Sequence, residues 1–214
     1  MPKYILTVFV IHSQNRPKQW LDTCLESVVH EEIQVQIIPG VPTLTELLHL
    51  RLTIPYLCDT KYMAFVDDDD WIDPKHITPM LEILENGNWG GIYSNENIVS
   101  QEGRIIGHRD SYMKIFDPTM HCRRLIDTHH LTIIKTDLAQ AAVKTIPTEH
   151  IYLEPLIYGL VGLMQPLVHY PHRPYNWRHY GKHSREKIEV QIKATKNAAI
   201  FYYMKIKKST TSES

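Results

Sequence analysis

The feature that most constrains this 214-residue chain is a run of four aspartates, Asp67–Asp70, directly after a strand-like apolar segment at 62–66. Adjacent carboxylates repel one another, so a fold that brings them together needs a compensating cation. Mg²⁺ and Mn²⁺ prefer such hard oxygen ligands and commonly bridge carboxylates to phosphate oxygens. An acidic turn before a helix also fits the run, because carboxylates are favourable at a helix N-terminus. The run therefore predicts either a metal site or a helix cap.

The first half of the chain alternates between strand and helix patterns. We expect strands at 4–11, 33–38, 62–66 and 89–94, with helices at 20–30, 44–58 and 74–85 between them. This order predicts an α/β fold with a mostly parallel sheet flanked by helices. Ligands of such sheets lie outside the carboxyl ends of the strands. The loops at 12–16, 39–40 and 67–70 should therefore meet at one edge.

The second half has a less regular pattern. We expect a hairpin at 98–106, a strand at 130–135, a helix at 153–163, an extended stretch at 167–175 broken by Pro171 and Pro174, a final helix at 188–207 and a disordered tail at 209–214. No internal repeat or linker divides the chain, which indicates a single domain.

Composition narrows the class of protein. The net charge of −1 gives no overall electrostatic case for a nucleic-acid or membrane partner. No segment approaches the roughly 20 apolar residues that a membrane-spanning helix needs, so we expect no transmembrane segment. The three cysteines (Cys24, Cys58 and Cys122) are widely spaced and odd in number. They predict reduced, mostly buried thiols and a cytoplasmic location.

Three segments carry a resemblance to a known family. Residues 61–85, KYMAFVDDDDWIDPKHITPMLEILE, resemble the DxD segment of family 2 glycosyltransferases of the GT-A fold. Residues 5–28 are similar to that family's first strand, Asn-Arg-Pro turn and first helix, and residues 89–107 resemble the strand and hairpin after the DxD segment. The resemblance implies a metal-dependent enzyme that transfers a sugar from a nucleotide-sugar donor to an acceptor hydroxyl with inversion.

The resemblance also implies a division of the GT-A domain. Residues 1–95 would form the nucleotide-sugar-binding half, residues 96–186 an acceptor half that extends the fold, and residues 187–208 a C-terminal helix. The chain departs from the family at Ile38–Val41, where an aspartate usually reads the base of the nucleotide. The identity of that base is therefore left open.

Site residues follow from the same resemblance. It implies that Asp69 binds Mn²⁺ or Mg²⁺ together with Asp67 and His179, with His183 as a second choice for the histidine. Asp70 would be a catalytic residue that faces the acceptor. The implied nucleotide-sugar contacts are His12, Ser13, Asn15, Arg16, Arg51, Asp67, Asp68 and Arg178.

Family members that invert use a carboxylate base to deprotonate the acceptor hydroxyl. Glu154 occupies the matching position, with Pro155 after it in the first turn of the expected helix. Leu153 replaces the acid that usually precedes the base, and Glu149 is a weaker candidate. Glu154 also fits a surface carboxylate that is stabilised by a helix N-terminus.

The acceptor is open among a saccharide, a lipid-linked carrier and a modified DNA base. DNA is an alternative because the final helix is basic and carries aromatic residues, although it also fits an amphipathic cover for the sheet. The lysines concerned are Lys187, Lys193, Lys196, Lys205, Lys207 and Lys208. A nucleotide-sugar-binding homologue without turnover is a further alternative.

Overall fold

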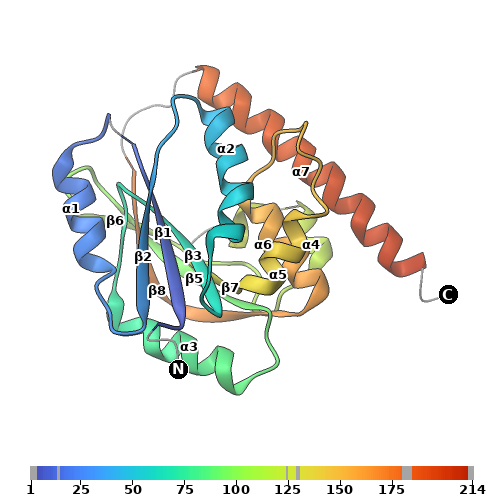
Figure 1. Ribbon diagram of the computed structural model, residues 1–214, viewed down its shortest axis with the longest axis horizontal. Coiled ribbons are helices and arrows are strands. Elements are labelled where there is room, and N and C mark those ends of the chain that lie inside the picture. Colours follow the sequence, from blue (N-terminus) through green and yellow to red (C-terminus); the bar gives the residue numbers. More distant parts are fainter. Residues whose placement is uncertain (1–3, 14, 124, 129–130, 180–184, 212–214) are drawn as a thin grey trace.

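The computed structural model describes residues 4–13, 15–123, 125–128, 131–179 and 185–211 (Figure 1). Its strands are β1 (Leu6–His12), β2 (Ile33–Pro39), β3 (Tyr62–Asp67), β4 (Trp71–Ile72), β5 (Gly91–Val99), β6 (Ile105–Arg109), β7 (Thr132–Lys135) and β8 (Leu167–Arg178). Its helices are α1 (Lys18–Ser27), α2 (Leu44–Thr53), α3 (Ile77–Asn86), α4 (Pro118–Arg123), α5 (Thr136–Val143), α6 (Glu154–Met164) and α7 (Arg185–Thr211). Short 3-10 turns lie at Ile54–Leu57, Pro74–His76 and Leu125–Thr128.

One sheet runs through both halves of the chain, in the order β2-β1-β3-β7-β5-β8-β4, with β6 beside β5. Strands β1, β2, β3, β5 and β8 point in one direction, and β4, β6 and β7 point in the other. Ile11 of β1 pairs with Ile38 of β2 on one side and with Asp67 of β3 on the other. The three strands therefore end together, as the sequence predicted for its three loops.

Side-chain alternation along the strands builds a core on each face of the sheet. In β1, Leu6, Val8 and Val10 pack with α1 and α3. Phe9 and Ile11 pack on the opposite face, whose core includes residues of α2, α5, α6 and α7. Figure 1 shows α1 at one edge of the sheet and the group of α2, α4, α5 and α6 on the other side, crossed by α7. None of the helices described has the length and apolar content needed to cross a bilayer.

Two expectations for the second half were wrong. Pro171 and Pro174 do not break the extended stretch, because β8 continues to Arg178. The pairing of β5 with β8 shifts between Ser94 and Glu96, opposite Tyr170 and Tyr175, so both prolines fall where the ladder is already irregular. The tail expected from 209 is also helical as far as Thr211, and residues 212–214 lie outside the described part.

The predicted hairpin is confirmed as the antiparallel pair β5 and β6. Gly103 in its turn has φ +85°, a conformation that L side chains rarely adopt. The sequence pattern did not predict α4, α5 or the two-residue β4. All three lie after Asp67–Asp70, where the apolar spacing is short or interrupted.

Glu96 lies fully buried in β5, with Arg109 Nε 3.3 Å from its Oε1. Burial raises the pKa of Glu96 to about 8 although Arg109 lowers it. Between pH 4.5 and 8 the folded state therefore binds more protons at this group than the unfolded chain does. Stability should fall as pH rises through that window, by up to about 1.4 kcal/mol per pH unit from this one group.

We expect Glu96→Gln to flatten this dependence, because the amide has no proton to lose. In urea unfolding from pH 5 to pH 9, the free energy of unfolding of Glu96→Gln should rise with pH relative to that of the wild type. Glu189→Gln, at an exposed position of α7, is the control and should follow the wild-type slope. Parallel slopes for Glu96→Gln and the wild type would contradict the assignment.

Candidate active site

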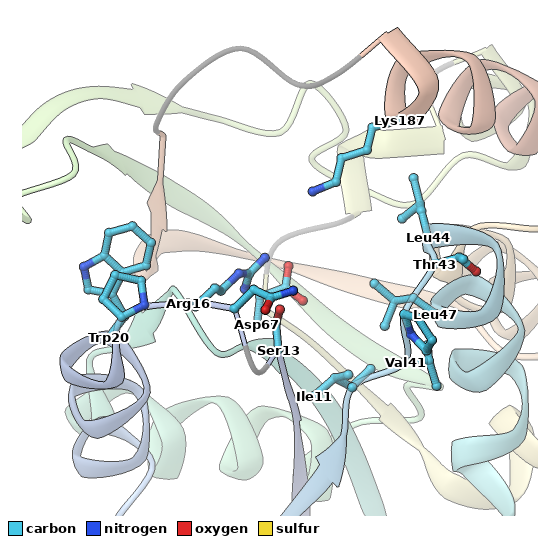
Figure 2. Close-up of a pocket in the computed structure, with 14 residues that line it drawn as sticks. Ile11, Ser13, Arg16, Trp20, Val41, Thr43, Leu44, Leu47, Asp67 and Lys187 are labelled. Atoms are coloured by element: carbon cyan, nitrogen blue, oxygen red, sulfur yellow. The ribbon is translucent and has the colours of Figure 1, made fainter.

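A cavity of about 720 Å³ opens at the carboxyl ends of β1, β2 and β3. In Figure 2, α1 borders it on one side and α2 on the other, and Lys187 points into it from the start of α7. Its apolar and small lining residues are Ile11, Pro17, Trp20, Gly40, Val41, Pro42, Leu44 and Leu47, and its polar lining residues are Ser13, Asn15, Arg16, Thr43, Asp67 and Lys187. This volume and mixture are typical of small-molecule sites.

Asp67 ends β3 on the sheet face that α2 and α6 cover, because it follows Met63 and Phe65 at two-residue spacing. Arg51 of α2 donates from Nη2 to Asp67 Oδ1 and from Nη1 to Glu154 Oε2 at the start of α6. The Arg51 and Glu154 side chains are only 10% and 3% exposed. Burial alone would lower the pKa of Arg51, but the attraction of Glu154 and Asp67 raises it overall. A charged, buried guanidinium therefore joins the predicted base to the predicted donor site.

Asp68 is fully buried and organises the loop after β1. Its Oδ2 lies 3.0 Å from His12 Nδ1 and accepts a hydrogen bond from Ser13 N at 2.7 Å. Its Oδ1 accepts from Arg16 Nη1. Asp68 is not a lining residue of the cavity. It holds Ser13 and Arg16, which give the cavity part of its polar lining.

Asp70 faces β8. It accepts hydrogen bonds from Tyr175 Oη and from Arg178 N, each at 2.7 Å. Burial, followed by repulsion from Asp69 and Asp67, raises the pKa of Asp70 well above its ordinary value. Ionising this carboxyl is therefore costly in the protein alone, and a nearby cation would reduce the cost.

Among the described residues, Asp67, Asp69 and Asp70 form a group that can hold a metal ion, with one oxygen of each within 4.8 Å of the others. Their carboxylate oxygens are the donors that Mg²⁺ and Mn²⁺ prefer. The residues present therefore fit the divalent ion that the resemblance implied.

Arg178 is buried beside the carboxylate group of Asp67, Asp69 and Asp70, and two indole rings pack against its guanidinium. Its guanidinium carbon lies 4.7 Å from the Trp20 ring centre and 4.9 Å from that of Trp71. Its Nε donates to Asp69 O at 2.8 Å. Such cation–π stacking fixes the guanidinium in place. Arg178, predicted to contact the nucleotide-sugar, thus supports the backbone of the aspartate run and links β8 to α1.

The other predicted residues divide into two groups. Ser13, Asn15, Arg16 and Asp67 line the cavity. His12, Arg51 and Glu154 are not among its lining residues: His12 contacts Asp68, and Arg51 pairs with Glu154 and Asp67. His179 is exposed, with its ring against Trp177, and is not in the carboxylate group found among the described residues. His183 lies outside the described residues, and Glu149 is exposed.

Sequence analysis missed Trp20, Tyr175 and Lys187 as residues of this region. From the sequence, Trp20 and Tyr175 look like ordinary core residues, because they are far in sequence from the residues that they contact, Arg178 and Asp70. Lys187 was predicted only as one of the basic residues of the final helix, and its position in the cavity lining depends on where the first turn of α7 lies.

Gly40 explains part of the cavity's shape. Its N–H donates to His12 O at 2.7 Å, and a Cβ at this position would lie 2.3 Å from the same oxygen. Only glycine lets the chain after β2 approach the end of β1 so closely. Gly40 therefore sets how closely the loop after β2 approaches the loop after β1 at the cavity.

At the level of sequence, no protein-family model and no curated protein matches this chain. Solved structures do. TarS of S. aureus, residues 1–349, matches with a TM-score of 0.58 at 12% identity, over 81% of this chain and 60% of that chain. The chain shares its α/β fold with TarS.

Two TarS complexes match in the same way. The complex with UDP-GlcNAc has a TM-score of 0.57 at 11% identity, over 83% of this chain and 59% of that chain. The complex with UDP has a TM-score of 0.59 at 13% identity, over 86% and 62%. This chain therefore spans about 60% of the TarS portion that it matches. At identities this low the structural likeness establishes the fold alone, and it confirms the predicted α/β arrangement of a mostly parallel sheet flanked by helices.

The Arg51 network gives a stability prediction. Arg51→Met removes the cation that Asp67 and Glu154 share and should lower the free energy of unfolding by about 3–5 kcal/mol at pH 7. The double variant Arg51→Met/Glu154→Gln should recover part of that loss, since no buried charge then lacks a partner at α6. Urea denaturation of both variants and of Glu154→Gln alone completes the cycle. A loss below about 1 kcal/mol for Arg51→Met would contradict a structural role.

Proposed function

We propose that this protein is a glycosyltransferase that moves a sugar from a nucleoside-diphosphate sugar to an acceptor hydroxyl, with a divalent cation. We base this proposal on one observation: Asp67 of the carboxylate group that fits a metal lies in the wall of the cavity at the ends of β1, β2 and β3. That edge of the sheet is where α/β folds bind their ligands. TarS, with the same fold, has been solved with UDP-GlcNAc and with UDP.

The two parts of the cavity wall suit the two parts of a nucleotide-sugar. Val41, Leu44 and Leu47 offer an apolar surface for a base and ribose. Arg16 and Lys187 bring positive charge for a diphosphate. The TarS complexes make uridine the first base to test, although the aspartate that the family uses for base recognition is absent at Ile38–Val41.

Asp67, Asp69 and Asp70 would hold Mg²⁺ or Mn²⁺, which when bound neutralises the charge of a departing diphosphate. His179 is kept as a proposed further ligand. In the reaction that we propose, the acceptor oxygen forms a bond to the anomeric carbon, and the bond from that carbon to the diphosphate oxygen breaks. The acceptor proton passes to Glu154, which must then share or exchange its contact with Arg51.

Nucleotide binding and the metal are tested together by thermal unfolding with a panel of nucleotide-sugars. A ligand at 100 times its Kd adds about 2.7 kcal/mol of stability, which gives a clear rise in Tm. We expect the largest rise for UDP-sugars with Mn²⁺, and Asp69→Asn should lose the Mn²⁺-dependent part. Asp110→Asn, an exposed residue paired with Arg173, is the matched control. An unchanged Mn²⁺-dependent rise in Asp69→Asn would refute the metal assignment.

Turnover separates this proposal from a binding protein that has the fold without activity. We expect release of UDP from a UDP-sugar with Mn²⁺ even without acceptor, at a rate that Asp69→Asn lowers by about 10²-fold or more. A donor that binds but is never cleaved, with any acceptor class, would favour the binding protein.

A modified DNA base is kept as a second acceptor candidate because of α7. After Glu189 this helix contains five lysines and no acidic residue. Of these, Lys193, Lys196, Lys207 and Lys208 are exposed. Contacts with phosphates would weaken steeply with salt. Retention on DNA that falls between 50 mM and 200 mM salt would support this acceptor, whereas no retention at 50 mM would leave saccharides and lipid-linked carriers.

A further inference from the structure

Arg16 binds the carboxylates that a metal ion would use. Its Nη1 donates to Asp68 Oδ1 and to Asp69 Oδ1. Asp69 is also one of the three members of the group that can hold a metal. The Arg16 guanidinium and a divalent cation therefore compete for the same carboxylate, that of Asp69.

The two arginines of the site differ in their freedom to move. Arg51, on α2, is 10% exposed and is held between Asp67 of β3 and Glu154 of α6. Arg16 is 28% exposed, belongs to the turn between β1 and α1, and lines the cavity. A guanidinium in this position can rotate from Asp69 toward the cavity without moving a helix.

Charge balance determines when such a movement is favourable. A divalent cation alone adds two positive charges beside Arg16, and a diphosphate alone adds negative charge beside Asp67–Asp70. When both ligands are bound, their charges nearly cancel. The guanidinium also gains a new partner, because its donors match phosphate oxygens as well as carboxylates.

We propose that Arg16 is an exchangeable countercation of the site. Without ligands it holds Asp68 and Asp69, and when nucleotide and metal bind together it leaves Asp69 to the metal and pairs with the diphosphate. This inference depends on the proposed function and specifies how the site is regulated: the exchange makes metal and nucleotide bind cooperatively. By linkage, each ligand then raises the affinity of the other by the same factor.

The test measures Mn²⁺ affinity by electron paramagnetic resonance, with and without saturating UDP, so it does not depend on turnover. In Arg16→Gln we expect Mn²⁺ alone to bind about tenfold more tightly than in the wild type, because the competing cation is gone. UDP should bind more weakly, and the gain in Mn²⁺ affinity caused by UDP should shrink by a similar factor, within the range usual for coupled sites.

Two further variants distinguish direct competition for the Asp69 carboxylate from a general effect of positive charge in the cavity. Lys187→Gln removes one positive charge from the same cavity and should change the affinity for Mn²⁺ alone less than about threefold, since the effect of a more distant charge is screened. Arg16→Lys keeps the charge but replaces the planar fork by a compact ammonium, and should bind Mn²⁺ alone more tightly than the wild type. It also serves if Arg16→Gln does not fold.

The outcomes are distinct. Equal effects of Arg16→Gln and Lys187→Gln, or no gain in Mn²⁺ affinity in either Arg16 variant, would overturn the role of Arg16 and leave the proposed function intact. A wild type that binds no Mn²⁺ even with UDP would overturn the proposed function as well. Tighter Mn²⁺ binding and smaller coupling, confined to the Arg16 variants, would establish the exchange.

Discussion

The contact of Arg51 with both Asp67 and Glu154 is the interaction on which the rest of the site depends. It joins the end of β3 to α2 and to the first turn of α6, and it does so in a place where none of the three charges is freely solvated. An unpaired charge there would be far more costly than an unpaired charge at the surface. Of the site's two arginines, Arg51 is thus buried beside Asp67 and outside the cavity lining, whereas Arg16 is more exposed and belongs to that lining.

Much of the first half of the fold could be predicted from sequence, because each element has a strong local pattern. The apolar runs of β1 and β3 predict buried strands, and the helical spacing of apolar residues in α1 and α3 predicts helices with one buried face. The meeting of three loops at one edge then follows from parallel topology alone. The aspartate run was predicted to be either a metal site or a helix cap from local sequence alone, since four carboxylates after a buried strand are costly without a compensating charge.

The arrangement of partners could not be predicted, because it comes from residues that are far apart in sequence. No local pattern near Arg51 predicts its contact with Glu154, which is 103 positions away, and none near Asp70 predicts its contact with Tyr175. Local rules also misjudged β8, since its prolines are tolerated only because the pairing with β5 is irregular at that point. Asp68 and Arg178 were predicted to contact the nucleotide-sugar; in the structure both are buried, and their partners come from the loop after β1 and from the aspartate run.

The alternation of β3 has a consequence for how this chain should be compared with others. Asp67 follows Met63 and Phe65 toward α2, whereas Asp68 contacts the loop after β1. Four identical letters therefore stand for four different environments. An alignment that slipped by one column would still match three of the four aspartates to aspartates, while it exchanged the partners of every carboxylate. Correspondence at this site has to be established from the pairing of β3 with β1, because the letters themselves carry no register.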